Sequence, residues 1–224
     1  MTSALLNLFS EDKSDDWRKN FSSFQQVKLS DKSLLYRQGY FCHHVYLIIK
    51  GVVKLSYLTE QGDEWTVALQ SRGDVIGLLI ANSARVAMTE SAQAIGNVSV
   101  IRMEHHEFKE IVTQHPVLLW QVFEAQCLRR QQAERKLLNM LTQSVENRII
   151  EMLKELAELF GKRCAHGFAL EIHLTQQELA DLIGASRSVV STVMNDLRHR
   201  QLLEYTRELI CINDGLFFNV VQKC

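Results

Sequence analysis

The sequence predicts an α+β fold made of an N-terminal antiparallel β-roll, a long helix and a C-terminal winged helix-turn-helix. Between residues 39 and 73 a glycine recurs every eleven or twelve residues, and the stretches between these glycines are β-rich, as in short strands joined by turns. Residues 116–141 contain no glycine and no proline after Pro116, which is typical of one long helix. Near the C-terminus, two short helical patterns meet at Gly184. These three features define the predicted architecture.

The composition is that of an ordinary globular protein. The 224 residues are 46% hydrophobic and 23% charged, and 25 lysines and arginines face 26 aspartates and glutamates, for a net charge of −1. This balance excludes a surface that is basic all over, but it leaves room for a local basic patch. No run of eighteen apolar residues is present, and the N-terminus lacks the basic start of a secretory signal, so we expect neither a membrane span nor export.

Five cysteines are scattered along the chain without a Cys-x-x-Cys pair. This pattern is typical of reduced thiols, so we expect a cytoplasmic protein. Cys127, within the long helix, could form an intersubunit disulfide or fill space as a small apolar side chain. Cys224 is expected to be an untethered thiol. The others are Cys42, Cys164 and Cys211.

Residues 1–115 are predicted to form the β-roll. Two β-rich runs, 45–49 and 52–55, are separated by Gly51, which is expected to lie in a turn. Residues 98–103 are expected to form the last strand of the roll.

Residues 116–144 are predicted to form the long helix, with a hinge at 142–144. Proline is favoured in the first helical turn, and about 26 residues extend roughly 39 Å at 1.5 Å per residue. Apolar residues recur at a spacing of three and four, which favours a seam between two copies of the helix in a dimer; the alternative is a helix packed on the roll. Gln126 and Arg130 interrupt the pattern. The predicted seam consists of Leu119, Val122, Gln126, Ala133, Leu137 and Met140.

Residues 145–224 are predicted to form the C-terminal domain. It begins with a helix over 145–160, followed by a loop over 161–167. Two β-rich runs, at 202–205 and 209–212, predict the hairpin of a wing.

Between that loop and the wing, the spacing predicts a helix-turn-helix. Thr175 and Glu178 form a capping box that starts the first helix. Gly184 can adopt the left-handed conformation that ends it, and Ser186 can cap the second helix. Ala180 supplies the small side chain needed where the two helices cross. A generic pair of helices would seldom meet all these requirements, although a purely structural helix pair is the alternative.

The second helix is expected to enter the major groove of DNA, where its first residues would contact base edges. Arg187 can bond guanine O6 and N7 together, and Asn195 could pair with adenine if it reaches the base. Nearby positive charge is expected from Arg198, His199, Arg200 and Arg207, although each alone could be part of a solvated helix end. The predicted DNA-binding residues are Thr175, Ser186, Arg187, Ser188, Ser191, Thr192, Asn195 and Arg198.

Together these parts resemble the cyclic-AMP receptor protein and fumarate–nitrate regulator (CRP/FNR) family of bacterial transcription factors, over roughly residues 20–215. The most specific matches are LIIKGVVKL around Gly51, GDVIG at 73–77, His115-Pro116, and LTQQELADLIGASRSVVSTVMNDLRHRQLL. The resemblance implies a cyclic-nucleotide-binding-like roll with an effector pocket, and a homodimer formed through the long helix. It also implies a palindromic operator in double-stranded DNA, and RNA polymerase as a partner if the protein is an activator.

Departures from the family's pattern argue against cyclic AMP as the ligand. Members that bind it carry a glutamate for the ribose where this chain has Leu78, and an arginine–serine pair for the phosphate where it has Met88-Thr89. A buried phosphate without its cation is costly. On the long helix, Ala133-Glu134 replaces the threonine–serine pair that contacts adenine. The candidate pocket residues are Gly77, Leu78, Met88, Thr89, Arg129, Arg130 and Glu134.

Charge in the middle of the long helix has two explanations. Arg129 or Arg130 could receive a small anionic effector, such as a carboxylate metabolite. Alternatively, Arg130 and Glu134, four residues apart, could form an ion pair within the helix or across the dimer.

The cofactors of other family members are not favoured. An iron–sulfur cluster needs several closely spaced N-terminal thiolates, and no cysteine precedes Cys42. A haem could take axial ligands from Cys42-His43-His44 and His105-His106, although such histidines are also common as exposed polar residues. Two alternative functions follow: a redox or gas sensor based on haem or thiols, and a ligand-independent DNA binder that uses the roll as a scaffold. We do not expect an enzyme, since no catalytic triad, phosphate-binding glycine loop or metal-ligand spacing is present.

The recognition helix also departs from the family's common pattern, Ser-Arg-Glu-Thr-Val-x-Arg, in which the two arginines and the glutamate read a shared half-site. This chain keeps Ser186 and Arg187 but has Ser188 and Thr192 at the other two reading positions. Each lost contact would cost about 1–3 kcal/mol on the family's usual site. We therefore expect a different operator.

Overall fold

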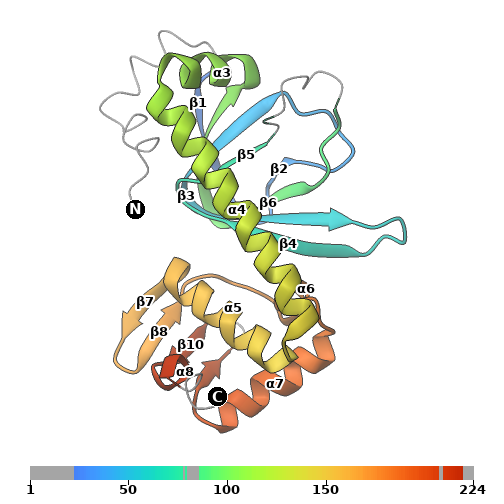
Figure 1. Cartoon of the computed structure of the whole chain (residues 1–224), viewed down its shortest axis with the longest axis vertical. Coiled ribbons are helices and arrows are strands. Elements are labelled where there is room, and N and C mark those ends of the chain that lie inside the picture. Colours follow the sequence, from blue (N-terminus) through green and yellow to red (C-terminus); the bar gives the residue numbers. More distant parts are fainter. Residues whose placement is uncertain (1–22, 78, 80–85, 207–208, 219–224) are drawn as a thin grey trace. The chain divides into compact units, whose positions relative to one another are not determined.

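The computed structural model describes residues 23–77, 79, 86–206 and 209–218, and the chain divides into two compact units, residues 1–132 and 133–224 (Figure 1). The boundary falls within the long helix, so its first part belongs to the roll and its last part to the C-terminal unit. None of the helices in the described residues is long and apolar enough to cross a membrane.

The first unit contains the predicted antiparallel roll. Its strands are β1 (Gln25–Leu29), β2 (Leu34–Tyr36), β3 (His44–Leu58), β4 (Glu64–Gln70), β5 (Val75–Gly77) and β6 (Ser91–Glu104). They form one sheet in the order β1-β6-β3-β4, while β2 also pairs with β6 and β5 with β3. β6 contains the predicted strand at 98–103 and extends it toward the N-terminus. The pairing of Gln25 with Arg102 joins the two ends of the roll.

β3 is one bent strand of 15 residues, not two strands separated by a turn. Its register with β6 shifts on both sides of Lys50, so Gly51 lies at a bulge and its predicted turn is wrong. Gly51 has a φ of +91°, and a Cβ there would lie 2.5 Å from the carbonyl oxygen of Asn97. Glycine is required because the backbone of the neighbouring strand β6 approaches so closely. The bent strand pairs with β5 near its start and with β4 near its end.

Two helices pack against the roll. Helix α3 (His105–Gln114), which the sequence analysis did not predict, lies at one end of the roll (Figure 1). Its Phe108 and Ile111 are buried in one core cluster with Leu118 and Val122, from the first two turns of α4 (Pro116–Thr142). The long helix therefore uses one apolar face to cover its own roll.

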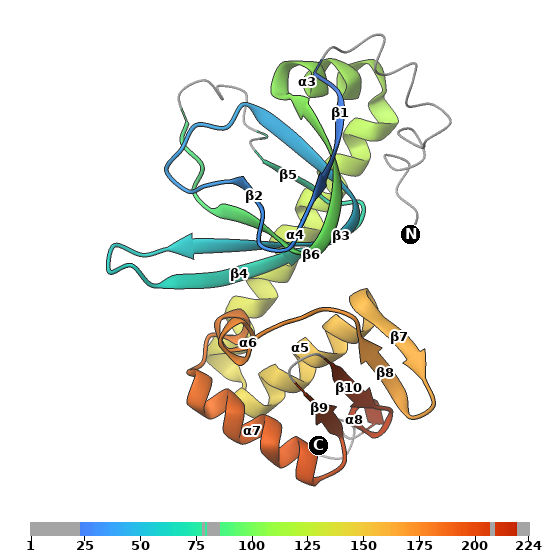
Figure 2. The same cartoon turned by 180° about the vertical axis from the view of Figure 1, so that it is seen from behind.

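The second unit combines the end of α4 with a helix-turn-helix and a small sheet (Figure 2). Its further elements are α5 (Val145–Phe160), β7 (Gly161–Cys164), β8 (Gly167–Leu170), α6 (Gln176–Ile183), α7 (Arg187–His199), β9 (Leu203–Tyr205), β10 (Ile210–Asn213) and α8 (Gly215–Phe218). The sheet has the order β7-β8-β10-β9. The predicted helix at 145–160 and the predicted wing hairpin are both present.

The predicted loop over residues 161–167 is wrong, because β7 forms a hairpin with β8. Lys162 pairs with Ala169, and Ala169 pairs in turn with Cys211 of β10. The strand sequence Gly-Lys-Arg-Cys is mostly exposed. It therefore lacks the alternation of apolar and polar residues by which a half-buried strand is recognised.

Three helices form the core of the second unit. Leu153 of α5, Leu179 of α6 and Leu197 of α7 are each no more than 1% exposed, and the three helices contact one another. This core holds α7 in place with one face directed outward.

Candidate functional site

Helix α6 begins at the predicted capping box. The Thr175 hydroxyl accepts a hydrogen bond from the backbone N–H of Glu178 (3.1 Å), and the Glu178 carboxylate accepts one from the backbone N–H of Thr175 (2.9 Å). The hydroxyl also donates to that carboxylate (2.9 Å). The side chain of Thr175, a predicted DNA contact, is thus engaged in starting the helix.

The turn between α6 and α7 is built on Gly184. Its φ of +64° and ψ of +49° are left-handed, and the Ala185 N–H donates to the Ala180 carbonyl (3.0 Å), as at other glycine C-caps. The Ser186 hydroxyl then accepts a hydrogen bond from the Val189 N–H (3.4 Å) and starts α7. These local contacts form the predicted helix-turn-helix.

Helix α7 has one buried and one exposed face. Val190, Met194 and Leu197 are buried. The predicted DNA-contact residues lie outside this buried face, where Ser191 is half-buried and the rest are exposed. Hydroxyl, amide and guanidinium groups on an exposed helix are suited to bond base edges and phosphates. The residues are Arg187, Ser188, Ser191, Thr192, Asn195 and Arg198.

The basic residues near α7 are not equally available to DNA. Arg200 Nη1 lies 2.7 Å from Glu146 Oε1 and 3.1 Å from Asp196 Oδ2, and hydrogen bonding to these two carboxylates raises the pKa of the arginine. Arg200 therefore links the end of α7 to α5, rather than adding uncompensated positive charge as expected. Arg187 is exposed, and Arg207 lies outside the described residues.

Sequence reasoning missed Tyr205, at the end of β9. Its hydroxyl donates a hydrogen bond to Asn195 Oδ1 (2.8 Å), and the guanidinium carbon of Arg198 lies 6.0 Å from the centre of its ring. Tyr205 lies two residues after the fully buried Leu203, so strand alternation places both on the same side of β9. The sequence shows this alternation, but it does not show that this side of β9 packs against α7.

The predicted effector pocket lies only partly in the described residues, because Leu78 is outside them. Gly77 has a φ of +99°, and a Cβ there would lie 2.5 Å from a backbone carbonyl oxygen of β3. Met88 is 4% exposed and belongs to a core cluster of the roll. Thr89 is exposed, and its hydroxyl donates to the Glu90 carboxylate (2.5 Å). The position expected to hold a phosphate-binding arginine is therefore filled by an apolar core residue.

A group of polar side chains in the first unit includes Arg129 of α4. The Tyr36 hydroxyl donates to Glu90 Oε1 (3.2 Å), and Asp74 Oδ2 accepts from the Ser71 N–H (2.7 Å). Burial, and then the charge of Glu90, raise the pKa of Tyr36; burial also raises the pKa of Asp74. The positive charge of Arg129 opposes both shifts. Arg129 itself is half-buried.

The predicted seam residues lie in different environments. Val122 is buried in the roll with Leu118, because that face of α4 covers its own domain, so Val122 is not available to a second helix. Gln126 and Met140 are half-buried. The remaining predicted seam residues, Leu119, Ala133 and Leu137, are exposed.

A second apolar face of α4 is exposed. Leu119, Phe123, Leu137 and Leu141 are 51–77% exposed. At 100° per residue these four lie within one narrow stripe on the helix, away from the direction of Leu118. We call this set the exposed stripe. Arg130 and Glu134, both exposed, share its direction at mid-helix.

The two histidine pairs considered as haem ligands are adjacent at one end of the roll, where β3 starts and β6 ends. His44 is opposite Glu104 in the pairing of β3 with β6, and the His105 N–H donates to the His43 carbonyl (2.8 Å). His106 Nδ1 lies 3.1 Å from Glu104 Oε2. Within the described parts of the chain, no group of three histidine, cysteine, aspartate or glutamate side chains is arranged to hold a metal ion. The haem hypothesis stays a prediction.

The cysteines in the described residues, Cys42, Cys127, Cys164 and Cys211, are free thiols. Cys42 is buried and Cys127 is half-buried, while Cys224 lies outside the described residues. A disulfide between the Cys127 residues of two subunits stays a prediction.

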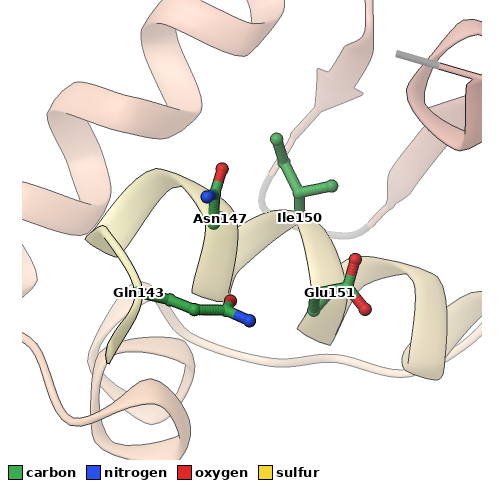
Figure 3. Close-up of a pocket in the computed structure, with 4 residues that line it drawn as sticks. All are labelled: Gln143, Asn147, Ile150 and Glu151. Atoms are coloured by element: carbon green, nitrogen blue, oxygen red, sulfur yellow. The ribbon is translucent and has the colours of Figure 1, made fainter. Parts of the chain in front are cut away.

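A small pocket lies at the start of α5 (Figure 3). Its volume is about 80 Å³, and Gln143, Asn147, Ile150 and Glu151 line it. The Gln143 side chain extends along α5 toward Glu151 (Figure 3), and its Oε1 has no hydrogen-bond partner in the described structure. Sites for organic ligands usually measure about 300–1,000 Å³, so this pocket is too small to receive an effector.

Comparisons with known proteins agree with this architecture. The cyclic nucleotide-binding domain family matches residues 26–115, and the Crp-like helix-turn-helix domain family matches residues 147–215. A global nitrogen regulator of Nostoc sp. is 26% identical over 170 residues, which cover 75% of this chain and 76% of the relative. A CRP-like cAMP-activated global transcriptional regulator of Mycobacterium tuberculosis is 26% identical over 171 residues, 76% of each chain. A solved structure of a CooA mutant from Carboxydothermus hydrogenoformans superposes with a TM-score of 0.75 at 21% identity, covering 97% of this chain and 95% of that one.

Proposed function

The chain belongs to the CRP/FNR family of transcription regulators, and from this premise we propose that it is a homodimer that binds a palindromic operator in double-stranded DNA through α7. The observation that carries the proposal is the exposed face of α7, where Arg187, Thr192 and Asn195 are exposed while the opposite face is buried. The relatives are transcription regulators and not enzymes.

The exposed stripe of α4 supports the homodimer. Leu119, Phe123, Leu137 and Leu141 together leave a large apolar area in water, and covering such a stripe with the same stripe of a second chain removes it from water on both sides. The two recognition helices of a dimer would then enter major grooves one helical turn apart, about 34 Å.

The recognition helix supports an operator that differs from the family's usual site. Arg187 retains a side chain able to bond a guanine, whereas Ser188 and Thr192 are short hydroxyl residues that can contact either bases or phosphates. We therefore expect a different base preference at the operator positions that face Ser188 and Thr192.

Met88 supports an effector other than cyclic AMP. An arginine at this site would neutralise a phosphate, but Met88 is a core residue with 4% exposure. Of the two arginines considered earlier, Arg129 is the better candidate for a small anionic effector such as a carboxylate, because it is half-buried while Arg130 is exposed. The packing of Met88 in the core equally favours the second candidate, a roll that serves as a scaffold without a ligand.

Selection of bound sequences from a random duplex library, with purified effector-free protein, tests the proposal. An enriched palindrome with half-sites one turn apart would support a dimeric DNA reader and favour the ligand-independent form. If nothing is enriched, the selection is repeated with cyclic AMP, small dicarboxylates and haem, each added separately. Enrichment with a dicarboxylate alone would support the anionic effector. Enrichment with cyclic AMP alone would overturn the ligand proposal, and failure under every condition would overturn DNA reading.

A further inference from the structure

We propose that Tyr205 is a positioning residue of the DNA interface: it holds the Asn195 side chain so that the amide N–H groups, and not the amide oxygen, are directed to the duplex. This inference rests on the proposed function, because it concerns how α7 contacts DNA. Tyr205 belongs to the wing, but it would act on DNA binding through Asn195 of the recognition helix.

Tyr205 is held in place by the hairpin of the wing. It is the last residue of β9 and pairs with Ile210 of β10. Directly after it, the Thr206 N–H donates to the Leu209 carbonyl (2.8 Å), which closes the hairpin. Leu203, on the same side of β9, is fully buried, and β9 contacts α7. The side chain of Tyr205 is therefore anchored by a strand pair and directed at the helix.

The hydrogen bond from Tyr205 orients the Asn195 amide. Its Oδ1 accepts the hydrogen bond from the Tyr205 hydroxyl (2.8 Å), while Asn195 itself is exposed on α7. An asparagine amide has one oxygen, which can accept two hydrogen bonds, and one nitrogen, which can donate two. Because the oxygen is turned toward the wing, the nitrogen on the other side of the amide is turned away from it.

The orientation of this amide determines which of its groups are available to DNA. A bidentate contact with adenine requires the amide oxygen to accept from N6 and the amide nitrogen to donate to N7. The Tyr205 hydroxyl takes one of the two lone pairs of the amide oxygen and turns that oxygen toward the wing. The N–H groups of Asn195 are then the groups directed outward, and they suit a phosphate oxygen or a base acceptor such as guanine O6 or thymine O4. The adenine contact considered from the sequence would require the second lone pair of that oxygen to face the base.

Arg198 adds a second contact to the same ring. Its guanidinium carbon is 6.0 Å from the ring centre of Tyr205, at the outer limit for a cation–π interaction. One aromatic side chain therefore restrains two donors that are three residues apart on α7.

The test compares Tyr205→Phe with wild type for binding to the selected operator and to a random duplex of equal length. Loss of the hydroxyl frees the Asn195 amide, so we expect operator affinity to fall about three- to tenfold, while affinity for the random duplex changes less. In an Asn195→Ala background, Tyr205→Phe should have no further effect. Tyr40→Phe, which removes a hydroxyl from an exposed tyrosine of the roll, is the matched control and should leave binding unchanged.

Asn195→Asp keeps the inference testable if Tyr205→Phe fails to fold. Aspartate retains an oxygen that accepts from Tyr205 but has no N–H groups, so thermal stability should persist while operator binding falls at least tenfold. Equal operator affinity of Tyr205→Phe and wild type would overturn the positioning role. So would a loss of operator affinity on Tyr205→Phe that is the same in the wild-type and Asn195→Ala backgrounds. Absence of operator binding by the wild-type protein would instead overturn the proposed function.

Discussion

Met140, in the last turn of α4, lies directly against Gly184 at the turn of the helix-turn-helix. A Cβ built on Gly184 would be 2.7 Å from Met140 Cε and 3.0 Å from its Sδ. The end of the long helix thus contacts the residue that sets the geometry between α6 and α7. Nearby, Lys136 is half-buried, and burial lowers its pKa while the charges of Glu155 and Asp181 oppose that shift.

Gly184→Ala should lower the free energy of unfolding of the second unit by about 1–3 kcal/mol, because a residue with a Cβ is strained in the left-handed conformation. Denaturant unfolding followed by circular dichroism measures the change. Adding Met140→Ala to Gly184→Ala should recover only the small part of this loss that comes from contact between the new Cβ and Met140. The part is small because the end of a methionine side chain can move aside. Wild-type stability in Gly184→Ala would contradict the strained turn.

Arg187→Ala should weaken binding to the selected operator by about 1–3 kcal/mol and relax the base preference at one position of each half-site. Fluorescence anisotropy with the operator and with single-base variants measures both effects. Arg37→Ala removes an exposed arginine from the roll and is the control for lost charge. Unchanged affinity in Arg187→Ala would show that another residue reads the base.

Phe123→Glu should convert the proposed dimer to monomers, because it places a charge within the exposed stripe, where a partner helix would bury it. Sedimentation velocity gives the mass of the species in solution. Leu128→Glu is the matched control: Leu128 is 60% exposed on the same helix, but five residues from Phe123 and so about 140° around the axis. Dimers in both variants, or monomers in both, would argue against the stripe as the interface.

The roll should lose stability as the pH falls below about 6.5, the ordinary pKa of histidine. Burial and the charge of Arg102 lower the pKa of His44 in the folded protein, and Glu104 only partly opposes them. In that pH range the unfolded chain binds the proton more readily, so acid favours unfolding. Thermal melting of wild type and His44→Gln between pH 7.5 and 5.5 measures the effect.

The melting temperature of His44→Gln should depend less on pH than that of wild type. His173→Gln, which alters an exposed histidine of the second unit, should retain the wild-type dependence. If His44→Gln and wild type lose the same stability on acidification, then His44 does not contribute.

The helix-turn-helix could be predicted residue by residue because its signals are local. The capping box at Thr175, the left-handed Gly184 and the cap at Ser186 each depend on neighbours within four residues. The long helix could also be predicted, because it begins at Pro116 and ends at Thr142, one residue beyond the uninterrupted run of residues 116–141.

Features that depend on distant partners could not be predicted. Gly51 is needed because Asn97 of β6 approaches it, and the sequence alone does not distinguish such a bulge from a turn. The spacing of apolar residues in α4 predicted its apolar faces, but it did not show that Val122 packs against the roll. Arg200 is paired with Glu146, 54 residues away, and Tyr205 meets Asn195 only once the wing has folded back on α7.

The pairing of β1 with β6 has a consequence for the order of folding. Gln25 and Arg102 are 77 residues apart in sequence, and their strands can pair only after the chain between them has closed a long loop, whose entropy opposes the contact. In the second unit, α6 and α7 are adjacent in sequence and joined by a tight turn. Contacts of low sequence separation form fastest. On refolding from denaturant, the helix-turn-helix is therefore expected to be protected from hydrogen exchange before the edge strand of the roll.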